Sequence, residues 1–137
     1  YLEWGMLGWV FVCDLMGTEK HNWVDQLCLV ALAEGMNGLM VHGLKNWVNE
    51  PRPDGAPYSF PSGHTAASFT AVVALSFAGE KRAWKAALVL ACLIAFSRMY
   101  LYVHYPTDIL GGALLGILCG YLGCRIVQKT EQYKRKI

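Results

Sequence analysis

The sequence is a succession of apolar stretches separated by short polar segments, and this pattern limits what it can fold into. The apolar stretches are residues 1–17, 24–44, 64–78, 85–103 and 106–127. A helix of about 20 residues crosses the hydrocarbon core of a bilayer, and the first stretch, which carries Glu3 and Asp14, is marginal for a span. We therefore expect an all-α, membrane-embedded helical bundle with four to five readable spans.

Composition agrees with a membrane environment without proving it. Hydrophobic residues make up 55% of the 137 residues, which excludes disorder, yet the mean hydropathy of +0.30 also permits a very apolar soluble domain. The net charge of +2 is too small to indicate a nucleic-acid partner. The five cysteines form no CxxC pair, so we expect neither a disulfide framework nor a metal site. The length suits one domain, which we expect to cover residues 1–137.

The placement of basic residues favours the membrane interpretation and gives an orientation. If the connections between spans are numbered alternately, nine of the twelve basic residues fall on one side. These nine are Lys20, Lys81, Arg82, Lys85, Arg125, Lys129, Lys134, Arg135 and Lys136. The positive-inside rule makes that side cytoplasmic. The other three, Lys45, Arg52 and Arg98, then lie on the outer side, against the rule, and need a functional reason.

The outer side also carries the most unusual polar residues of the chain. Residues 45–63 contain four of the five prolines, so they cannot continue a helix, and a long ordered loop is usually functional. His64 follows this loop, and His104 and Asp108 follow Arg98. Each group falls at the outer end of an expected helix. Three cations around two histidines and one carboxylate predict an anion site with an acid and a base nearby.

Local sequence suggests how this site is built. Ser62 can cap the helix that starts near His64, and the N–H groups at such a helix end bind phosphate oxygens. Pro106 suits a first helical position, which places Asp108 in the first turn within reach of one nitrogen of His104. A carboxylate that fixes the histidine tautomer leaves the other ring nitrogen able to attack or to accept a proton.

Each of these residues has a simpler interpretation when it is taken alone. Asp108 suits any helix start because of the helix dipole, and the three outer cations suit membrane-surface anchors. Their convergence on one side favours a functional site. Glu34 and Asn37, inside a span, are interpreted as inter-helix hydrogen-bonding residues, with substrate contact as the alternative.

Three motifs on the outer side resemble the signature of the type 2 phosphatidic acid phosphatase superfamily, and they match it at every signature position. The motifs are Lys45-x6-Arg52-Pro53, Pro61-Ser62-Gly63-His64 and Ser97-Arg98-x5-His104-x3-Asp108. The run RPDGAPYSFPSGHTAASF is similar to bacterial members. Membrane members usually have six spans, and the chain opens on Tyr1 without an initiator Met, so we expect an N-terminal span to be missing.

The resemblance implies a phosphatase that needs no metal or other cofactor. It makes His104 the nucleophile that forms a phosphohistidine, Asp108 its orienting acid and His64 the general acid and base. The phosphate-binding residues that it implies are Lys45, Arg52, Ser62, Gly63 and Arg98.

The expected function is hydrolysis of a membrane lipid phosphate or diphosphate. Phosphatidic acid, phosphatidylglycerol phosphate and undecaprenyl diphosphate stay open as substrates. The expected location is the bacterial cytoplasmic membrane, with the site facing the periplasm or cell exterior and with no protein partner implied.

There are two alternatives to this function. A vanadate-dependent haloperoxidase has a similar anion site in a soluble protein, which the predicted membrane spans disfavour. The alternative from another class is a catalytically silent membrane protein that binds or translocates lipid phosphates.

Overall fold

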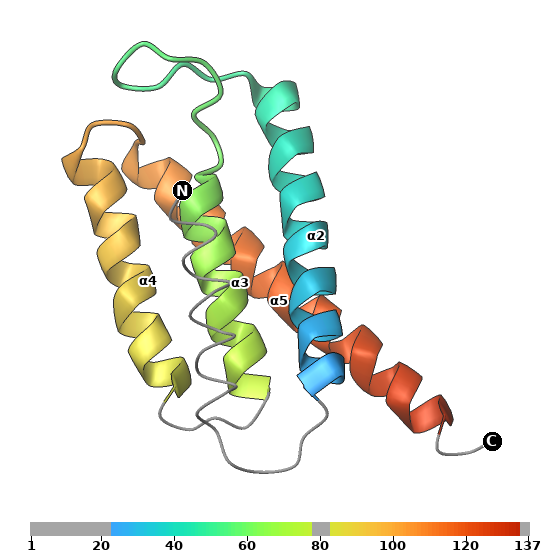
Figure 1. Ribbon diagram of the computed structural model, residues 1–137. Helices are drawn as coiled ribbons and strands as arrows, with labels where there is room; N and C mark the ends of the chain where they lie inside the picture. Colours follow the sequence, from blue (N-terminus) through green and yellow to red (C-terminus); the bar gives the residue numbers. More distant parts are fainter. Residues whose placement is uncertain (1–22, 78–82, 135–137) are drawn as a thin grey trace.

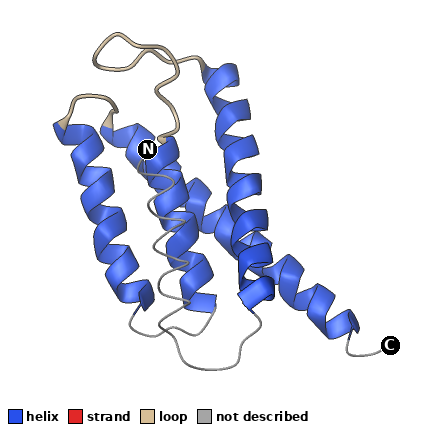
Figure 2. Ribbon diagram, viewed as in Figure 1, coloured by secondary structure: helices blue, strands red, loops and turns tan. Residues whose placement is uncertain are grey.

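The computed structural model describes residues 23–77 and 83–134, so the apolar stretch 1–17 lies outside the described residues. The described part is all-helical and has no strand (Figure 2). Its helices are α2 (Trp23–Val48), α3 (Gly63–Phe77), α4 (Ala83–Tyr100) and α5 (Pro106–Lys134). Residues 49–62 connect α2 to α3, and residues 101–105 connect α4 to α5, at the same end of the bundle (Figure 1). We call this end the loop end.

The helix boundaries agree with the sequence-based ranges to within a few residues, except at the C-terminus of α5. α2 continues past Leu44 to Val48, so Lys45 lies in its last turn. Asn49 then takes a left-handed backbone conformation (φ 48°), and the next residues include prolines that cannot continue a helix. α4 ends at Tyr100, before a left-handed Tyr102 (φ 56°). α5 begins at Pro106 as expected and continues to Lys134, beyond the predicted end at Val127.

α3 is the central helix of the described bundle. It packs most extensively against α5 and also contacts α2 and α4, whereas α4 and α5 touch little (Figure 1). Most of its buried residues are small, among them Ala66, Ser68 and Ala71, as expected for a helix that other helices approach closely. The position of α3 therefore decides how the other helices are arranged around the loop end.

Glycines of α5 bring its backbone against α3. An added Cβ at Gly112 would lie 2.5 Å from the carbonyl oxygen of Ser62, and one at Gly116 would collide with the carbonyl oxygen of Ala66. The hydroxyl of Thr70 in α3 also donates to the carbonyl of Gly116 at 3.1 Å. Because no side chain separates the two backbones, the relative position of α3 and α5 has little freedom.

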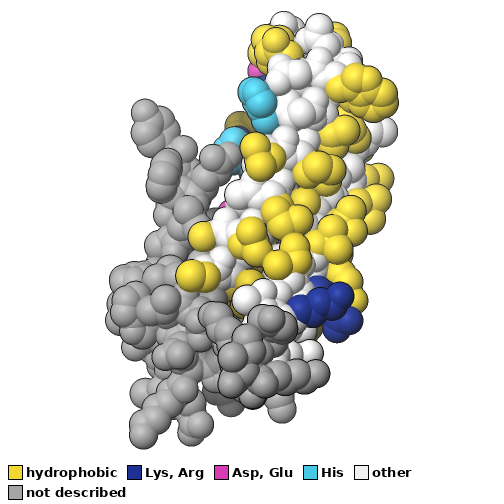
Figure 3. All heavy atoms as spheres, turned by 90° about the vertical axis from the view of Figure 1, so that its right-hand side faces the viewer, with side chains coloured by type: hydrophobic (Ala, Val, Ile, Leu, Met, Phe, Trp, Pro, Cys, Tyr) yellow, Lys and Arg dark blue, Asp and Glu magenta, His cyan; other side chains and the backbone are white. Residues whose placement is uncertain are grey.

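The surface of the bundle is rich in exposed apolar side chains. Residues 106–130 of α5 form a 25-residue segment of hydropathy 1.8, long and apolar enough to cross a membrane. Figure 3 shows hydrophobic side chains spread over one face, with Lys and Arg side chains gathered near its lower end. Exposed aromatic residues mark the loop end: Trp47, Tyr58, Tyr100, Tyr102 and Tyr105. An apolar belt with aromatic side chains at its edge is typical of proteins in lipid.

The contact between α3 and α5 predicts a loss of stability for Gly116→Ala. The added methyl meets the backbone of α3, which cannot move aside as a side chain would, and such overpacking costs about 1–3 kcal/mol. We expect a lower Tm in detergent, measured by circular dichroism.

Gly38→Ala is the matched control for this experiment. Gly38 is an exposed glycine in the interior of α2, with no described atom within 4 Å of an added Cβ, so its Tm should be unchanged or higher because alanine favours the helix. Equal Tm values for the Gly116→Ala variant and the native protein would contradict the close contact.

Candidate active site

The site residues predicted from the sequence lie at the loop end. Lys45 and Arg98 lie in the last turns of α2 and α4. Ser62 precedes α3, His104 lies in the link between α4 and α5, and Asp108 lies in the first turn of α5. Helices that run in alternate directions bring these positions, far apart in the sequence, to one end of the molecule (Figure 1).

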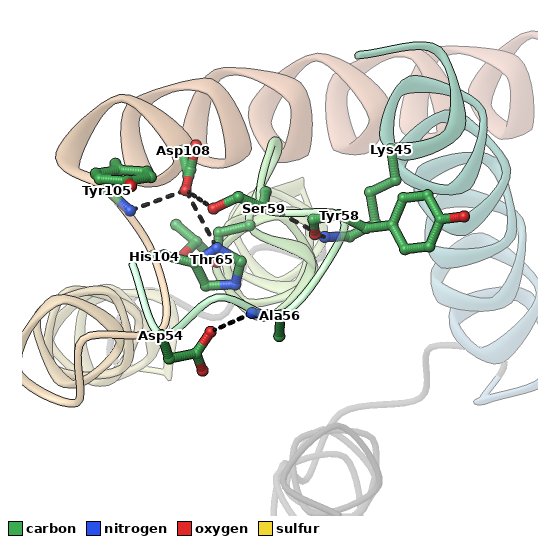
Figure 4. A network of polar contacts seen from close by, with 10 residues as sticks. Lys45, Asp54, Ala56, Tyr58, Ser59, Thr65, His104, Tyr105 and Asp108 are labelled. Carbon is green, nitrogen blue, oxygen red and sulfur yellow. Dashed lines mark hydrogen bonds and ion pairs between the residues drawn. The ribbon is translucent and has the colours of Figure 1, made fainter. Parts of the chain in front are cut away.

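The carboxylate of Asp108 is the centre of the polar network. It is fully buried, and its Oδ2 accepts hydrogen bonds from the Ser59 hydroxyl at 2.5 Å and from the Tyr105 backbone N–H at 2.8 Å (Figure 4). The same oxygen lies 3.3 Å from Nδ1 of His104. A buried carboxylate is stable only when donors surround it, and here they also fix its direction toward the histidine.

Backbone contacts hold this carboxylate in place. The N–H of Ser62, at the start of α3, donates to the backbone carbonyl of Asp108 at 3.0 Å. One turn further along, the glycine contact of α5 with α3 continues the same interface. The N-terminus of α3 and the first turn of α5 are therefore in direct contact, and each of them carries residues of the candidate site.

His104 is buried beside Asp108, and its environment sets its protonation state. Burial lowers the pKa of His104 below its usual value, the hydrogen bond with Asp108 opposes this, and the positive charges of Arg52 and Lys45 lower it further. The imidazole is therefore neutral at neutral pH. With Asp108 as acceptor at Nδ1, that nitrogen carries the proton and Nε2 carries the lone pair, an assignment made from the hydrogen-bond network.

The loop 49–62 has hydrogen bonds of its own and is tied to α2. The backbone N–H of Arg52 donates to the carbonyl of Ala56 at 2.7 Å, and the Ala56 N–H donates to the carboxylate of Asp54 at 3.0 Å. The ammonium of Lys45 donates to the Tyr58 carbonyl at 2.6 Å and lies 3.4 Å from the Ser59 carbonyl (Figure 4). These bonds give the loop internal order and tie it to the last turn of α2.

Two arginines of the loop end have donors without a partner among the described residues. Nε of Arg52 and Nε of Arg98 are both buried and make no hydrogen bond there. An unpaired buried donor costs about 1–3 kcal/mol, and a planar guanidinium matches the oxygens of a phosphate in pairs. Each of these two donors is therefore able to serve an anionic ligand.

The remaining predicted residues lie in different surroundings. Ser62 is fully buried, and its hydroxyl accepts a hydrogen bond from the Thr65 hydroxyl at 3.1 Å. Gly63 and His64 are the first two residues of α3 and are partly exposed. Asn37 donates to Glu34 in its own helix at 3.5 Å, and this contact does not test the bonds between helices that the sequence suggested. These two lie about three to four turns before the end of α2 at Val48, which disfavours substrate contact.

Ser59 is the residue of the network that sequence reasoning missed. Its hydroxyl contacts a carboxylate 49 positions further along the chain. A serine in a proline-rich loop has no periodicity and no distinctive spacing, so a single sequence gives no signal for such a contact.

The fold and the site define a helical protein with a buried histidine–aspartate pair beside cationic side chains. The chain belongs to the PAP2 superfamily, which matches residues 26–132. It is 37% identical over 124 residues to phosphatidylglycerophosphatase B of Bacillus subtilis, covering 79% of this chain and 61% of that protein. The chain thus spans less than two thirds of the length of this relative.

Solved structures agree with the family assignment. The crystal structure of Aquifex aeolicus LpxE has a TM-score of 0.76 at 30% identity and covers 91% of this chain and 80% of that one. The crystal structure of a transmembrane PAP2-type phosphatidylglycerolphosphate phosphatase from Bacillus subtilis has a TM-score of 0.69 at 30% identity, over 93% and 77% of the two chains. The expected helical fold is confirmed, and the chain is an integral membrane protein.

Proposed function

We propose that this chain is a membrane phosphatase that hydrolyses a lipid phosphate or diphosphate through a phosphohistidine intermediate. The observation that carries the proposal is the buried pair of His104 and Asp108, with Nδ1 and Oδ2 3.3 Å apart, and the positive charges of Lys45 and Arg52 act on this histidine. A neutral histidine with an oriented lone pair is a nucleophile, and cations around it attract a phosphate. The name of the B. subtilis relative, phosphatidylglycerophosphatase B, agrees with this chemistry.

In the proposed first step, Nε2 of His104 attacks the phosphorus and the bond to the leaving oxygen breaks. His64 gives that oxygen a proton, and Asp108 stabilises the positive imidazole that results. In the second step a water molecule gives a proton to His64 and attacks the phosphohistidine. Inorganic phosphate then leaves, and both histidines return to their starting states.

The cations would stabilise the charge that develops during transfer. Three phosphoryl oxygens carry most of this charge in the transition state. The unpartnered Nε donors of Arg52 and Arg98, with the ammonium of Lys45, suit these oxygens. Gly63 and Ser62 would add donors from the start of α3. In this proposal the side chains supply the positive charge without a metal ion.

The first test is phosphate release by the purified protein in detergent with EDTA present. The substrates are phosphatidic acid, phosphatidylglycerol phosphate and undecaprenyl diphosphate. We expect release from at least one of them and its loss in His104→Ala, because the phosphoenzyme cannot form. His42→Ala is the matched control, since His42 is exposed on α2 and should not affect turnover.

Two results would contradict the proposal. Turnover within about tenfold of native in His104→Ala, a difference of less than about 1.4 kcal/mol in the barrier, would show that His104 is not the nucleophile. Binding of these lipids with no release by the native protein would favour a catalytically silent lipid-binding protein instead.

The phosphate-binding role of Arg98 predicts a large effect of Arg98→Lys. Lysine keeps the charge but loses the paired N–H donors, so activity should fall by about tenfold or more and vanadate should inhibit more weakly. Arg125→Lys, an exposed change on the distant part of α5, should leave both unchanged. Full activity and unchanged vanadate inhibition in Arg98→Lys would show that Arg98 is a surface anchor and does not bind phosphate.

The orientation proposed here turns the loop end toward the periplasm or cell exterior of a bacterial cytoplasmic membrane. Exposed Arg125 and Lys129 near the C-terminal end of α5 support a cytoplasmic position for that end. In a cysteine-free background, an impermeant maleimide should label Asp54→Cys in intact cells and Gln132→Cys only after permeabilisation. Labelling in the reverse order would place the site in the cytoplasm.

A further inference from the structure

Ser59 has every polar group engaged at the point where the loop meets the site. The residue is fully buried. Its backbone N–H donates to the carbonyl of Glu50 at 2.7 Å, and its carbonyl lies 3.4 Å from the ammonium of Lys45. Its hydroxyl donates to Oδ2 of Asp108. One residue thus contacts both a predicted phosphate-binding cation and the carboxylate beside the predicted nucleophile (Figure 4).

The hydroxyl contact limits how the carboxylate can turn. Oδ2 of Asp108 receives the Ser59 hydroxyl and the Tyr105 N–H and also faces His104, whereas Oδ1 is buried without a partner among the described residues. Rotation about the terminal bond of an aspartate is soft. With the hydroxyl gone, the Tyr105 N–H and Nδ1 of His104 would still contact Oδ2, but they would favour the present orientation less strongly over one in which the two oxygens share the contacts.

We propose that Ser59 is a positioning residue whose hydroxyl holds Oδ2 of Asp108 toward Nδ1 of His104. The carboxylate in turn keeps the proton on Nδ1 and the lone pair on Nε2. Ser59 acts through Asp108 and is not expected to touch the reacting phosphorus. The inference rests on the function proposed above for its effect on turnover, but its effect on the histidine can be measured without any substrate.

The substrate-free test is the tautomer of His104 in ¹⁵N-labelled protein, read by NMR from the imidazole nitrogens. The native protein should show His104 with the proton on Nδ1, and Ser59→Ala should show a mixture with the proton on Nε2. Ser68→Ala is the matched control. Ser68 is equally buried, but its hydroxyl donates to the Thr65 carbonyl at 2.8 Å, so the tautomer of His104 should not change.

The second readout is steady-state kinetics on the lipid that the native protein hydrolyses. We expect kcat to fall about tenfold or more in Ser59→Ala with KM changed less than about threefold, because orientation and not substrate binding is lost. In an Asp108→Asn background the same change should have little further effect. A purely structural role would lower kcat by the same factor in both backgrounds.

The outcomes separate this inference from the proposed function. An unchanged tautomer in Ser59→Ala overturns the inference, and so does a changed tautomer with undiminished kcat. A native protein that releases no phosphate while the tautomer still depends on Ser59 overturns the proposed function and leaves the positioning role standing. If Ser59→Ala does not fold, Ser59→Cys, which has nearly the same volume and a much weaker donor, carries the same tests.

Discussion

The contact between the backbones of α3 and α5 is the constraint on which the rest of the structure depends. Gly112 and Gly116 leave no space for a side chain between the helices, and the N–H of Ser62 bonds to the carbonyl of Asp108 at the end of the same contact. In lipid, helices gain little from burying apolar side chains, so close backbone approach and hydrogen bonds hold them together. The interface that stabilises the bundle therefore also sets the position of the buried carboxylate.

Some site residues lie on α3 and α5, whose relative position is fixed, and others lie on the helices and the loop around this pair. Asp108 lies on α5, and Ser62 lies at the start of α3, whereas Lys45 and Arg98 come from α2 and α4. α2 and α4 each pack on α3 from separate sides (Figure 1). The loop 49–62 joins the two groups, because Lys45 contacts its carbonyls and the Ser59 hydroxyl contacts the carboxylate. The serines and Asp108 are buried, and Lys45 and Arg98 are partly buried, which strengthens electrostatic interactions at this end of the molecule.

Much of this arrangement could be predicted from the sequence. Apolar stretches and prolines gave the helices to within a few residues, apart from the longer α5, and Pro106 correctly indicated the helix start that puts Asp108 near His104. The positions of Lys45, Arg52 and Arg98, against the positive-inside rule, led to the prediction of an anion site, which stays a prediction. These features are local or periodic, or they follow from the placement of charges, so they can be predicted from a single sequence.

Other features depend on contacts that no local pattern encodes. The contact of Ser59 with Asp108 requires a loop to fold back over the start of α5. The extension of α2 past Lys45 to Val48 depends on where the left-handed Asn49 ends the helix. For Ser62, the sequence predicted a cap, but not that Thr65 would use its hydroxyl. Each depends on the tertiary packing of neighbouring segments.

The exposed aromatic side chains at the loop end have a consequence for how a lipid would reach the site. Tyrosine and tryptophan prefer the zone between hydrocarbon and water, so the exposed side chains of Trp47, Tyr100 and Tyr102 favour a position of the loop end at the depth of the headgroups. A lipid phosphate already lies at that depth and could enter by lateral diffusion with its chains still in the bilayer. Under the proposed function, the concentration that governs encounter is the mole fraction of the lipid in the membrane plane, and dilution with inert lipid would slow phosphate release even at constant bulk concentration.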